Sequence, residues 1–313
     1  MFIHRFYKNH MTTVDRVLVG LIIFGLIAGI TLNLLNDVDF HYPTILLFAT
    51  HITSISWVQA VVITILGFMF LFYGMFIQNA SPRASTFIWG AGLFFWCALT
   101  NIVLVNGIQS TPFPPIDSWL LKVDQSMGVN TPTLMSWTYH HPDLHHILTT
   151  TYNSLIVELL GIPTILTLFS ARKSLTIFYI ALFSTLYVGC AIYYFFPTMA
   201  PSGVLHSPYF STAQHDTSLR FYDVHHFIHT TITDGGLIAF PSFHVIWAIL
   251  LTNACRAKKI FFYPVALFNL LLITSTVLLG WHYLTDVIGG AVLAAAGIAF
   301  GEWVLRESVV SSQ

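Results

Sequence analysis

The sequence predicts an all-α polytopic membrane protein with about eight transmembrane helices. Hydrophobic residues make up 56% of the 313 residues and charged residues only 8%, and the mean hydropathy is +0.75. This composition excludes an ordinary soluble domain. The apolar residues also fall into runs of about 20, the length that a helix needs to cross a bilayer. We expect a single integral membrane domain over residues 1–313.

Eight apolar runs are candidate membrane spans, and they cover residues 17–35, 57–77, 86–108, 153–169, 174–196, 240–255, 260–280 and 282–304. The shortest, 240–255, is accepted because it must pair with 260–280. The first run has a basic lead-in but no small-residue cleavage site after it, so we expect a retained anchor rather than a signal peptide. We divide the chain into N-terminal spans (1–108), an outer loop (109–152) and a core (153–304).

Lysine and arginine residues indicate the orientation, because short cytoplasmic loops are enriched in them. With eight spans, ten of the twelve fall on one side, and only Lys122 and Arg220 fall on the other. We therefore expect both termini in the cytoplasm and the opposite loops outside. The compact chain favours a bacterial inner membrane.

The outer loop is expected to contain an interfacial amphipathic helix from Ile116 to Met127. Asp117 and Asp124 in this helix are seven residues apart, so both could share one face, although a solvated face explains them equally well. Aromatic residues in the loop suit a belt at the membrane surface: Trp119, Trp137 and Tyr139.

Several classes of partner are disfavoured by composition and spacing. The net charge of −1 and the lack of a basic stripe make nucleic acid an unexpected partner. The three cysteines lie in apolar stretches without paired spacing, so we interpret them as small core residues. The histidines of the outer loop fit no zinc spacing, and no metal site is expected there: His140, His141, His145 and His146.

Two short histidine motifs, at 240–244 and 280–286, are separated by one hydrophobic hairpin that would return both histidines to the same membrane surface. His282 and Asp286 are spaced i,i+4, so on a helix the carboxylate would hold one ring nitrogen and leave the other free to attack. His244 would supply the proton that a leaving alkoxide needs. Either motif alone is often structural, but their combination favours phosphoryl transfer.

These motifs resemble the type 2 phosphatidic acid phosphatase superfamily, whose second motif is Pro-Ser-x-His and whose third is Ser-Arg-x5-His-x3-Asp. The third motif aligns as Ser275-Thr276-x5-His282-x3-Asp286. The resemblance implies a six-helix core and chemistry without metal or other cofactor. By it, His282 is the nucleophile, Asp286 its orienting carboxylate, and His244 the general acid and later base.

The sequence departs from the superfamily pattern at two places. Thr276 stands where the third motif usually has arginine, and 196–203 replaces the usual Lys-x6-Arg-Pro first motif. The form without arginine looks more like the inositol phosphorylceramide synthase and sphingomyelin synthase branch, which moves phospho-head-groups between lipids. Lys122 and Arg220 become candidates for the missing cations, although anchoring to anionic head groups explains them about as well.

A phosphate seat is expected at the start of the helix that follows the second motif. Pro241 fits the first turn of a helix, so the amides near Ser242, Phe243 and His244 would point outward. The Ser242 hydroxyl could add a further contact. Ser275, the first residue of the third motif, is another candidate for substrate binding.

We expect a membrane lipid phosphatase or phospho-head-group transferase that acts through a phosphohistidine at the extracytoplasmic surface, on a lipid phosphate or a phospholipid. A transporter or channel with outward-facing histidines and a non-catalytic lipid-binding relative are the alternatives. Glu158 lies inside a span, where ionisable groups are often functional, although it is near enough to the outer end to snorkel. Gly297 and Gly301 predict close packing of the last helix.

Overall fold

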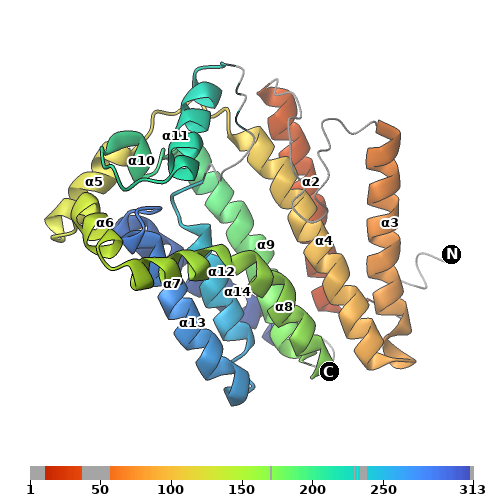
Figure 1. Cartoon of the computed structure of the whole chain (residues 1–313). Coiled ribbons are helices and arrows are strands. Elements are labelled where there is room, and N and C mark those ends of the chain that lie inside the picture. Colours follow the sequence, from red (N-terminus) through yellow and green to blue (C-terminus); the bar gives the residue numbers. More distant parts are fainter. Residues whose placement is uncertain are drawn as a thin grey trace.

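A computed structural model describes residues 11–36, 57–169, 171–228, 230, 232 and 238–310, and helices are the only regular elements in these ranges. The helices that correspond to the eight predicted spans are α2 (Thr13–Leu35), α3 (Trp57–Phe76), α4 (Pro82–Ile108), α8 (Leu155–Leu168), α9 (Arg172–Phe195), α12 (Phe243–Ala254), α13 (Lys259–Leu278) and α14 (Leu284–Val310). The predicted all-α membrane fold is confirmed (Figure 1).

Six helices in the described ranges are long and apolar enough to cross a membrane: α2, α3, α4, α9, α13 and α14. The predicted span 153–169 is instead the second half of a bent pair, in which α7 (Pro142–Asn153) meets α8 at 54°. Helix α12 has only 12 residues, which at 1.5 Å per residue is about 18 Å. It is therefore shorter than the hydrocarbon core of a bilayer.

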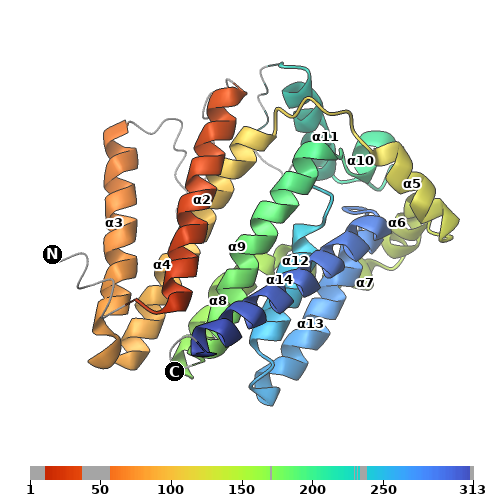
Figure 2. The ribbon, with the colours of Figure 1, turned by 180° about the vertical axis from the view of Figure 1, so that it is seen from behind.

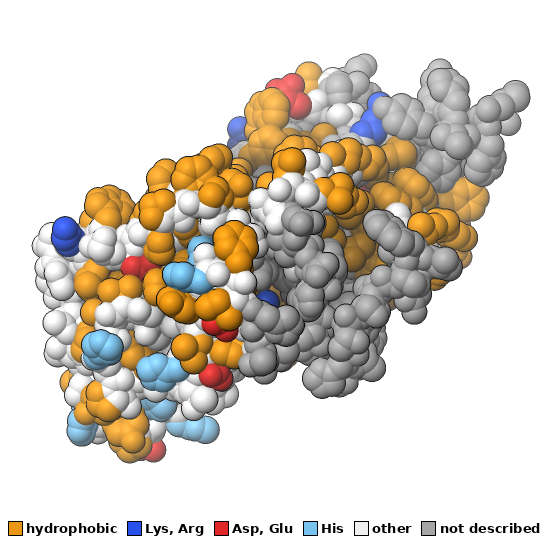
Figure 3. All heavy atoms as spheres, turned by 90° about the horizontal axis from the view of Figure 1, so that it is seen from above, with side chains coloured by type: hydrophobic (Ala, Val, Ile, Leu, Met, Phe, Trp, Pro, Cys, Tyr) orange, Lys and Arg blue, Asp and Glu red, His pale blue; other side chains and the backbone are white. Residues whose placement is uncertain are grey.

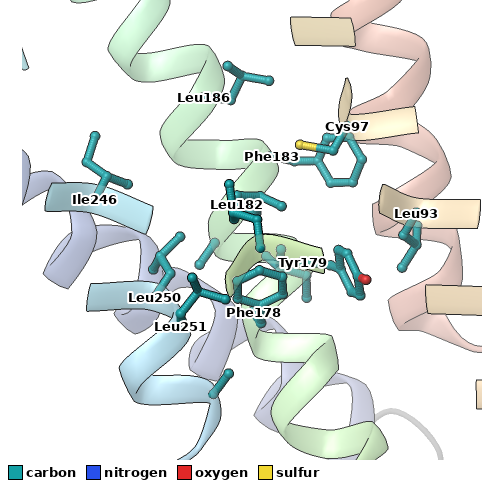
Figure 4. Packing of buried hydrophobic residues seen from close by; sticks show 14 of the residues in the cluster. Leu93, Cys97, Phe178, Tyr179, Leu182, Phe183, Leu186, Ile246, Leu250 and Leu251 are labelled. Carbon is teal, nitrogen blue, oxygen red and sulfur yellow. The ribbon is translucent and has the colours of Figure 1, made fainter. Parts of the chain in front are cut away.

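Helix α9 lies in the middle of the bundle and packs against α4, α12 and α14 (Figures 1 and 2). Its aromatic and aliphatic side chains fill the space between α4 and α12 (Figure 4). Helices α2 and α3 pack on α4, and both carry many exposed hydrophobic side chains. Such apolar outer faces are what a helix in contact with lipid requires.

The small residues of α14 allow its close contact with α9, as predicted. A Cβ at Gly301 would lie 2.9 Å from the carbonyl oxygen of Ile177, and a Cβ at Gly297 would overlap the side chain of Thr185. The two helices approach this closely only because glycine presents no side chain.

The helix ends that carry most of the described basic residues meet at one end of the bundle. Arg172 at the start of α9 lies 3.8 Å from Asp15 at the start of α2 and donates a 3.1 Å hydrogen bond to Ser85 of α4. Glu302, near the end of α14, pairs with Arg256 and Arg306. We call this the basic end, and it agrees with the predicted grouping of cations.

Short helices cover the opposite end of the bundle (Figure 1): α5 (Asp117–Ser126), α6 (Thr131–Tyr139), α7, α10 (Pro201–Val204) and α11 (Thr212–His225). The predicted interfacial segment is confirmed as a helix, one residue shorter at each end. Seen from above, histidine and hydrophobic side chains lie close together on this face (Figure 3).

Candidate functional site

His244 is the second residue of α12, and Ser242 is the N-cap of that helix. The Ser242 hydroxyl accepts a 3.5 Å hydrogen bond from the amide of Val245, as N-cap serines do. The structure corrects the expected place of Pro241, which precedes the N-cap instead of occupying the first turn. The amide of Ser242 does not point outward either, because it donates to the carbonyl of Asp286 at 3.2 Å.

His282 lies in the turn between α13 and α14, which we call the His282 turn (residues 279–283). The amides of Trp281 and His282 both donate to the carbonyl of Thr276 at 3.0 Å. Thr276, which stands in place of the usual arginine, thus contributes its backbone to the turn. Its side chain is buried and donates to the carbonyl of Ile273.

Asp286 holds the His282 turn from the first turn of α14. Its Oδ2 lies 3.3 Å from Nδ1 of His282 and accepts a 3.0 Å hydrogen bond from the amide of Tyr283. The expected pairing of His282 with Asp286 is present, but the two residues do not share a helix face, because His282 precedes the helix. The carboxylate reaches back from a helix N-terminus, where a negative charge is favoured.

The two motif histidines come together at the end of the bundle that lies opposite the basic end. Their ring centroids are 5.8 Å apart. His282 is 5% exposed, and burial lowers the pKa of its imidazole, while the backbone of Ala239 acts in the opposite direction. The ring is therefore neutral near pH 7, which is the state that a nucleophilic imidazole requires.

Tyr152 of α7 supports His244, and the sequence reasoning missed it. Its ring stacks on His244 with centroids 4.3 Å apart and an interplanar angle of 16°. The Tyr152 ring also stacks on the ring of Trp281, with centroids 5.1 Å apart and an interplanar angle of 8°. No local signal marks this tyrosine, because its partners lie about 90 and 130 residues further along the chain.

The two aspartates of α5 face inward, so of the two interpretations left open by the sequence, a solvated face is excluded. Asp117 is 2% exposed and Asp124 is 1% exposed. Asp117 accepts hydrogen bonds from the amide of Met199 at 2.8 Å and from the hydroxyl of Tyr283 at 3.3 Å. The spacing i,i+7 was the signal that both share one face of the helix.

Asp124 binds the start of α14. Its Oδ2 accepts a 2.7 Å hydrogen bond from the amide of Leu284, and its Oδ1 accepts from the amide and the hydroxyl of Thr285 at 3.0 and 2.6 Å. Both carboxylate oxygens thus bind the first two residues of α14, directly after the His282 turn.

The other candidates for substrate binding lie at different places in the structure. Ser242 connects the two motifs through the hydrogen bond from its amide to the carbonyl of Asp286, whereas the Ser275 hydroxyl donates to the carbonyl of Leu272 in its own helix. Lys122 is on the exposed side of α5, away from the two aspartates. Arg220 of α11 is 7% exposed and lies near enough to Tyr193 for its charge to act on that phenol.

Other predicted features lie apart from the two histidines. Glu158 is half-buried on α8 and lies 3.5 Å from the hydroxyl of Ser154. The rings of His140 and His141 bind backbone carbonyls of α6 through Nδ1, at 2.7 Å each. Among the residues that the structure describes, no group of three His, Cys, Asp or Glu side chains is arranged to hold a metal ion.

A family model for the PAP2 superfamily matches residues 118–300, which is more than half of the chain. The chain belongs to the PAP2 superfamily. No curated protein and no solved structure matches it. The match to PAP2 includes α5 from its second residue and extends through both histidine motifs into α14. Membership in PAP2 supports a lipid enzyme of the phosphatase or phosphotransferase type, while the synthase-like branch stays a prediction.

Asp117 makes the stability of this PAP2 chain depend on pH. Burial raises the pKa of its carboxyl from 3.8 to about 7, nearby Asp286 raises it further, and the hydrogen bonds from Met199 and Tyr283 oppose the shift. Between pH 3.8 and about pH 7 the folded state binds more protons than the unfolded state. The free energy of unfolding therefore falls as the pH rises through this window.

Replacing Asp117 with asparagine is expected to flatten this dependence, because an amide has no proton to lose and still offers an oxygen to the amide of Met199. The measurement is the thermal unfolding midpoint in detergent at pH 5 and pH 8. The midpoint should fall more for the wild type than for Asp117→Asn. Asp286, Tyr283 and the other titrating groups near Asp117 are present in both proteins, so the difference between the two falls reports on Asp117. Equal falls in the two proteins would contradict the assignment.

Proposed function

We propose that this PAP2 chain is a membrane lipid phosphatase or phospho-head-group transferase that acts through a phosphohistidine intermediate. The proposal is carried by one observation: the rings of His244 and His282 lie 5.8 Å apart at one end of the bundle, with Asp286 at 3.3 Å from Nδ1 of His282. Rings this close allow a nucleophile and a proton donor to act on one phosphoryl group.

In the first step, Nε2 of His282 attacks the phosphorus of the lipid substrate. The carboxylate of Asp286 favours the tautomer with a proton on Nδ1, and this leaves the Nε2 lone pair free. A bond forms between Nε2 and phosphorus, and the bond from phosphorus to the lipid oxygen breaks. His244 donates a proton to that departing oxygen.

In the second step, the roles of His244 reverse. It takes a proton from water or from the hydroxyl of a second lipid, and the resulting oxygen nucleophile attacks the phosphohistidine. The bond between phosphorus and Nε2 breaks, and His282 returns to its starting state. Water as acceptor gives a phosphatase, and a lipid alcohol gives a transferase.

The N-terminus of α12 supports the binding of the phosphoryl group. The amides of Phe243 and His244 are in its first turn, and neither amide donates a hydrogen bond to any described residue. Free amides at a helix N-terminus attract anions. Arg220, which is buried, suits a contact with the substrate phosphate, whereas exposed Lys122 suits an anionic head group at the membrane surface.

The charge distribution supports an extracytoplasmic site. The basic end lies opposite the two histidines, and cytoplasmic loops are the ones enriched in lysine and arginine. Exposed aromatic side chains on the same end as the histidines suit the interfacial region of a bilayer: Trp119, Trp137 and Tyr139. Both termini would then be cytoplasmic, and a bacterial inner membrane remains the proposed location.

The lack of the usual motif arginine and lysine is shared with the branch that the sequence resembles, which moves phospho-head-groups between lipids, so transfer is tested beside hydrolysis. A transporter is disfavoured, since His282 and the buried carboxylates of Asp117, Asp124 and Asp286 gather at one end of the bundle rather than at its middle. A non-catalytic relative is disfavoured by the assembled His244, His282 and Asp286.

The test uses the full chain in lipid nanodiscs, with a panel of lipid phosphates and phospholipids, each with and without a lipid alcohol. Free phosphate and newly formed phospholipid are measured together. We expect turnover of at least one substrate by the wild type and none by the double variant His244→Ala, His282→Ala. Phosphate release identifies a hydrolase, and product that depends on the alcohol identifies a transferase. A folded wild type that is inactive toward every substrate contradicts the proposal.

A further inference from the structure

We propose that Asp124 of α5 is a positioning residue that determines the conformation of the His282 turn. Its carboxylate serves as an N-cap of α14 that is supplied by a different helix. The consequence for catalysis rests on the proposed function, whereas the structural role does not.

Helix α14 begins at Leu284, and the first amides of a helix have no partner within the helix. Asp286 satisfies the amide of Tyr283, and Asp124 satisfies those of Leu284 and Thr285. Two carboxylates therefore hold three successive amides. Negative charge at this position is favoured by the helix dipole as well as by the hydrogen bonds.

The distances from Asp124 are those of strong, charge-assisted hydrogen bonds. They are 2.7 Å to the amide of Leu284 and 2.6 Å to the hydroxyl of Thr285. Because Asp124 is 1% exposed, water does not replace it readily. Removal of this carboxylate would leave the amides of Leu284 and Thr285 and the Thr285 hydroxyl without their acceptor.

His282 is only two residues before Leu284, so the position of its ring depends on how both sides of the turn are held. The carbonyl of Thr276 holds the α13 side, and Asp124 holds the α14 side. Helix α5 is itself anchored, because the amide of Ile116 donates to the carbonyl of Pro197 at 2.9 Å. Asp124 thus connects a fixed outer helix to the proposed nucleophile without touching it.

The first measurement is hydrogen exchange at the amides of Leu284 and Thr285 in the full chain in nanodiscs. Asp124→Ala is expected to speed exchange at both amides by about 10- to 100-fold, since each loses a charged acceptor. Gln125→Ala is the matched control, because Gln125 lies next to Asp124 on the exposed side of α5, and its exchange should match the wild type. Unchanged protection of both amides in Asp124→Ala overturns the proposal.

The second measurement separates positioning from general loss of structure. With an active substrate, Asp124→Ala should lower kcat by about 10- to 100-fold and change KM by less than about threefold, because a misplaced nucleophile slows the chemical step. Asp124→Asn should recover part of kcat, since its amide oxygen still accepts one hydrogen bond. A change confined to KM, or an equal loss of kcat in the Asn and Ala variants, overturns the proposed effect of Asp124 on catalysis.

The two readouts keep this proposal distinct from the proposed function. If the wild type has no activity on any lipid, the proposed function fails, but the exchange rates still decide the role of Asp124. If Asp124→Ala does not fold, Asp124→Asn carries the test. Wild-type exchange at Leu284 and Thr285 in that variant, together with a wild-type kcat wherever the wild type is active, then overturns the proposal.

Discussion

Alanine at position 282 is expected to lower phosphoryl transfer by a factor on the order of 10⁴, because it removes the proposed nucleophile. The neighbouring His244 cannot take its place in the turn, since it belongs to α12 and its ring is stacked on Tyr152. The rate is measured on the substrate identified from the lipid panel. His282→Ala should still fold, because the turn keeps its backbone hydrogen bonds to Thr276.

His146→Ala is the control for this variant, because His146 is an exposed histidine of α7 at the same end of the bundle. It should keep the wild-type rate. A substrate with labelled phosphorus should also leave label on the wild type that is stable in alkali and lost in acid, as expected for phosphohistidine, and none on His282→Ala. Wild-type turnover by His282→Ala would rule out His282 as the nucleophile.

The second large effect is expected from Gly290→Ala in α14. A Cβ at this position would lie 2.7 Å from the carbonyl oxygen of Ser242 and 3.1 Å from Cβ of Val245. The first of these is a backbone atom of the second motif and cannot rotate away. Helices α12 and α14 must therefore move apart, and the hydrogen bond from Ser242 to the carbonyl of Asp286 is weakened.

We expect Gly290→Ala to destabilise the protein by about 2 kcal/mol, within the usual range for overpacking. Because the same shift separates His244 from His282, we also expect a rate loss on the order of 10²-fold. Thermal unfolding in detergent and turnover are measured together. Unchanged stability and unchanged rate would show that the two motifs are not packed this closely.

Gly161→Ala provides the matched control for this substitution. Gly161 is also inside a helix, α8, but a Cβ there meets no atom within 4 Å. Alanine is a better helix former than glycine, so this variant should be neutral or stabilised by about 0.4–1 kcal/mol. The contrast between the two glycines isolates the effect of the contact with Ser242 from that of helix propensity.

Much of the fold could be predicted from the sequence because the relevant signals are local. Apolar runs of about 20 residues located the apolar helices, and the small residues of α14 predicted that it packs closely against a neighbour. The hairpin between the two motifs predicted that His244 and His282 would meet, since two consecutive helices return the chain to the same end. The family match then supports the predicted superfamily.

Features set by distant contacts were missed or misread. The sequence did not decide whether the face of α5 with Asp117 and Asp124 is buried or solvated, because the partners at 284 and 285 are 160 and 161 residues from Asp124. Tyr152 carried no pattern that connects it to His244. Even the pairing of His282 with Asp286 was right for a wrong reason, since the carboxylate reaches back from a helix N-terminus.

The sequence alone thus determined where the apolar helices lie and which residues are available for phosphoryl transfer, because these follow from hydrophobic length and short spacing. Only the tertiary structure decided how the His282 turn is held. The donors and acceptors that hold it come from α5, α13 and α14, and hydrogen bonds between segments so far apart in the chain exist only after the bundle has packed.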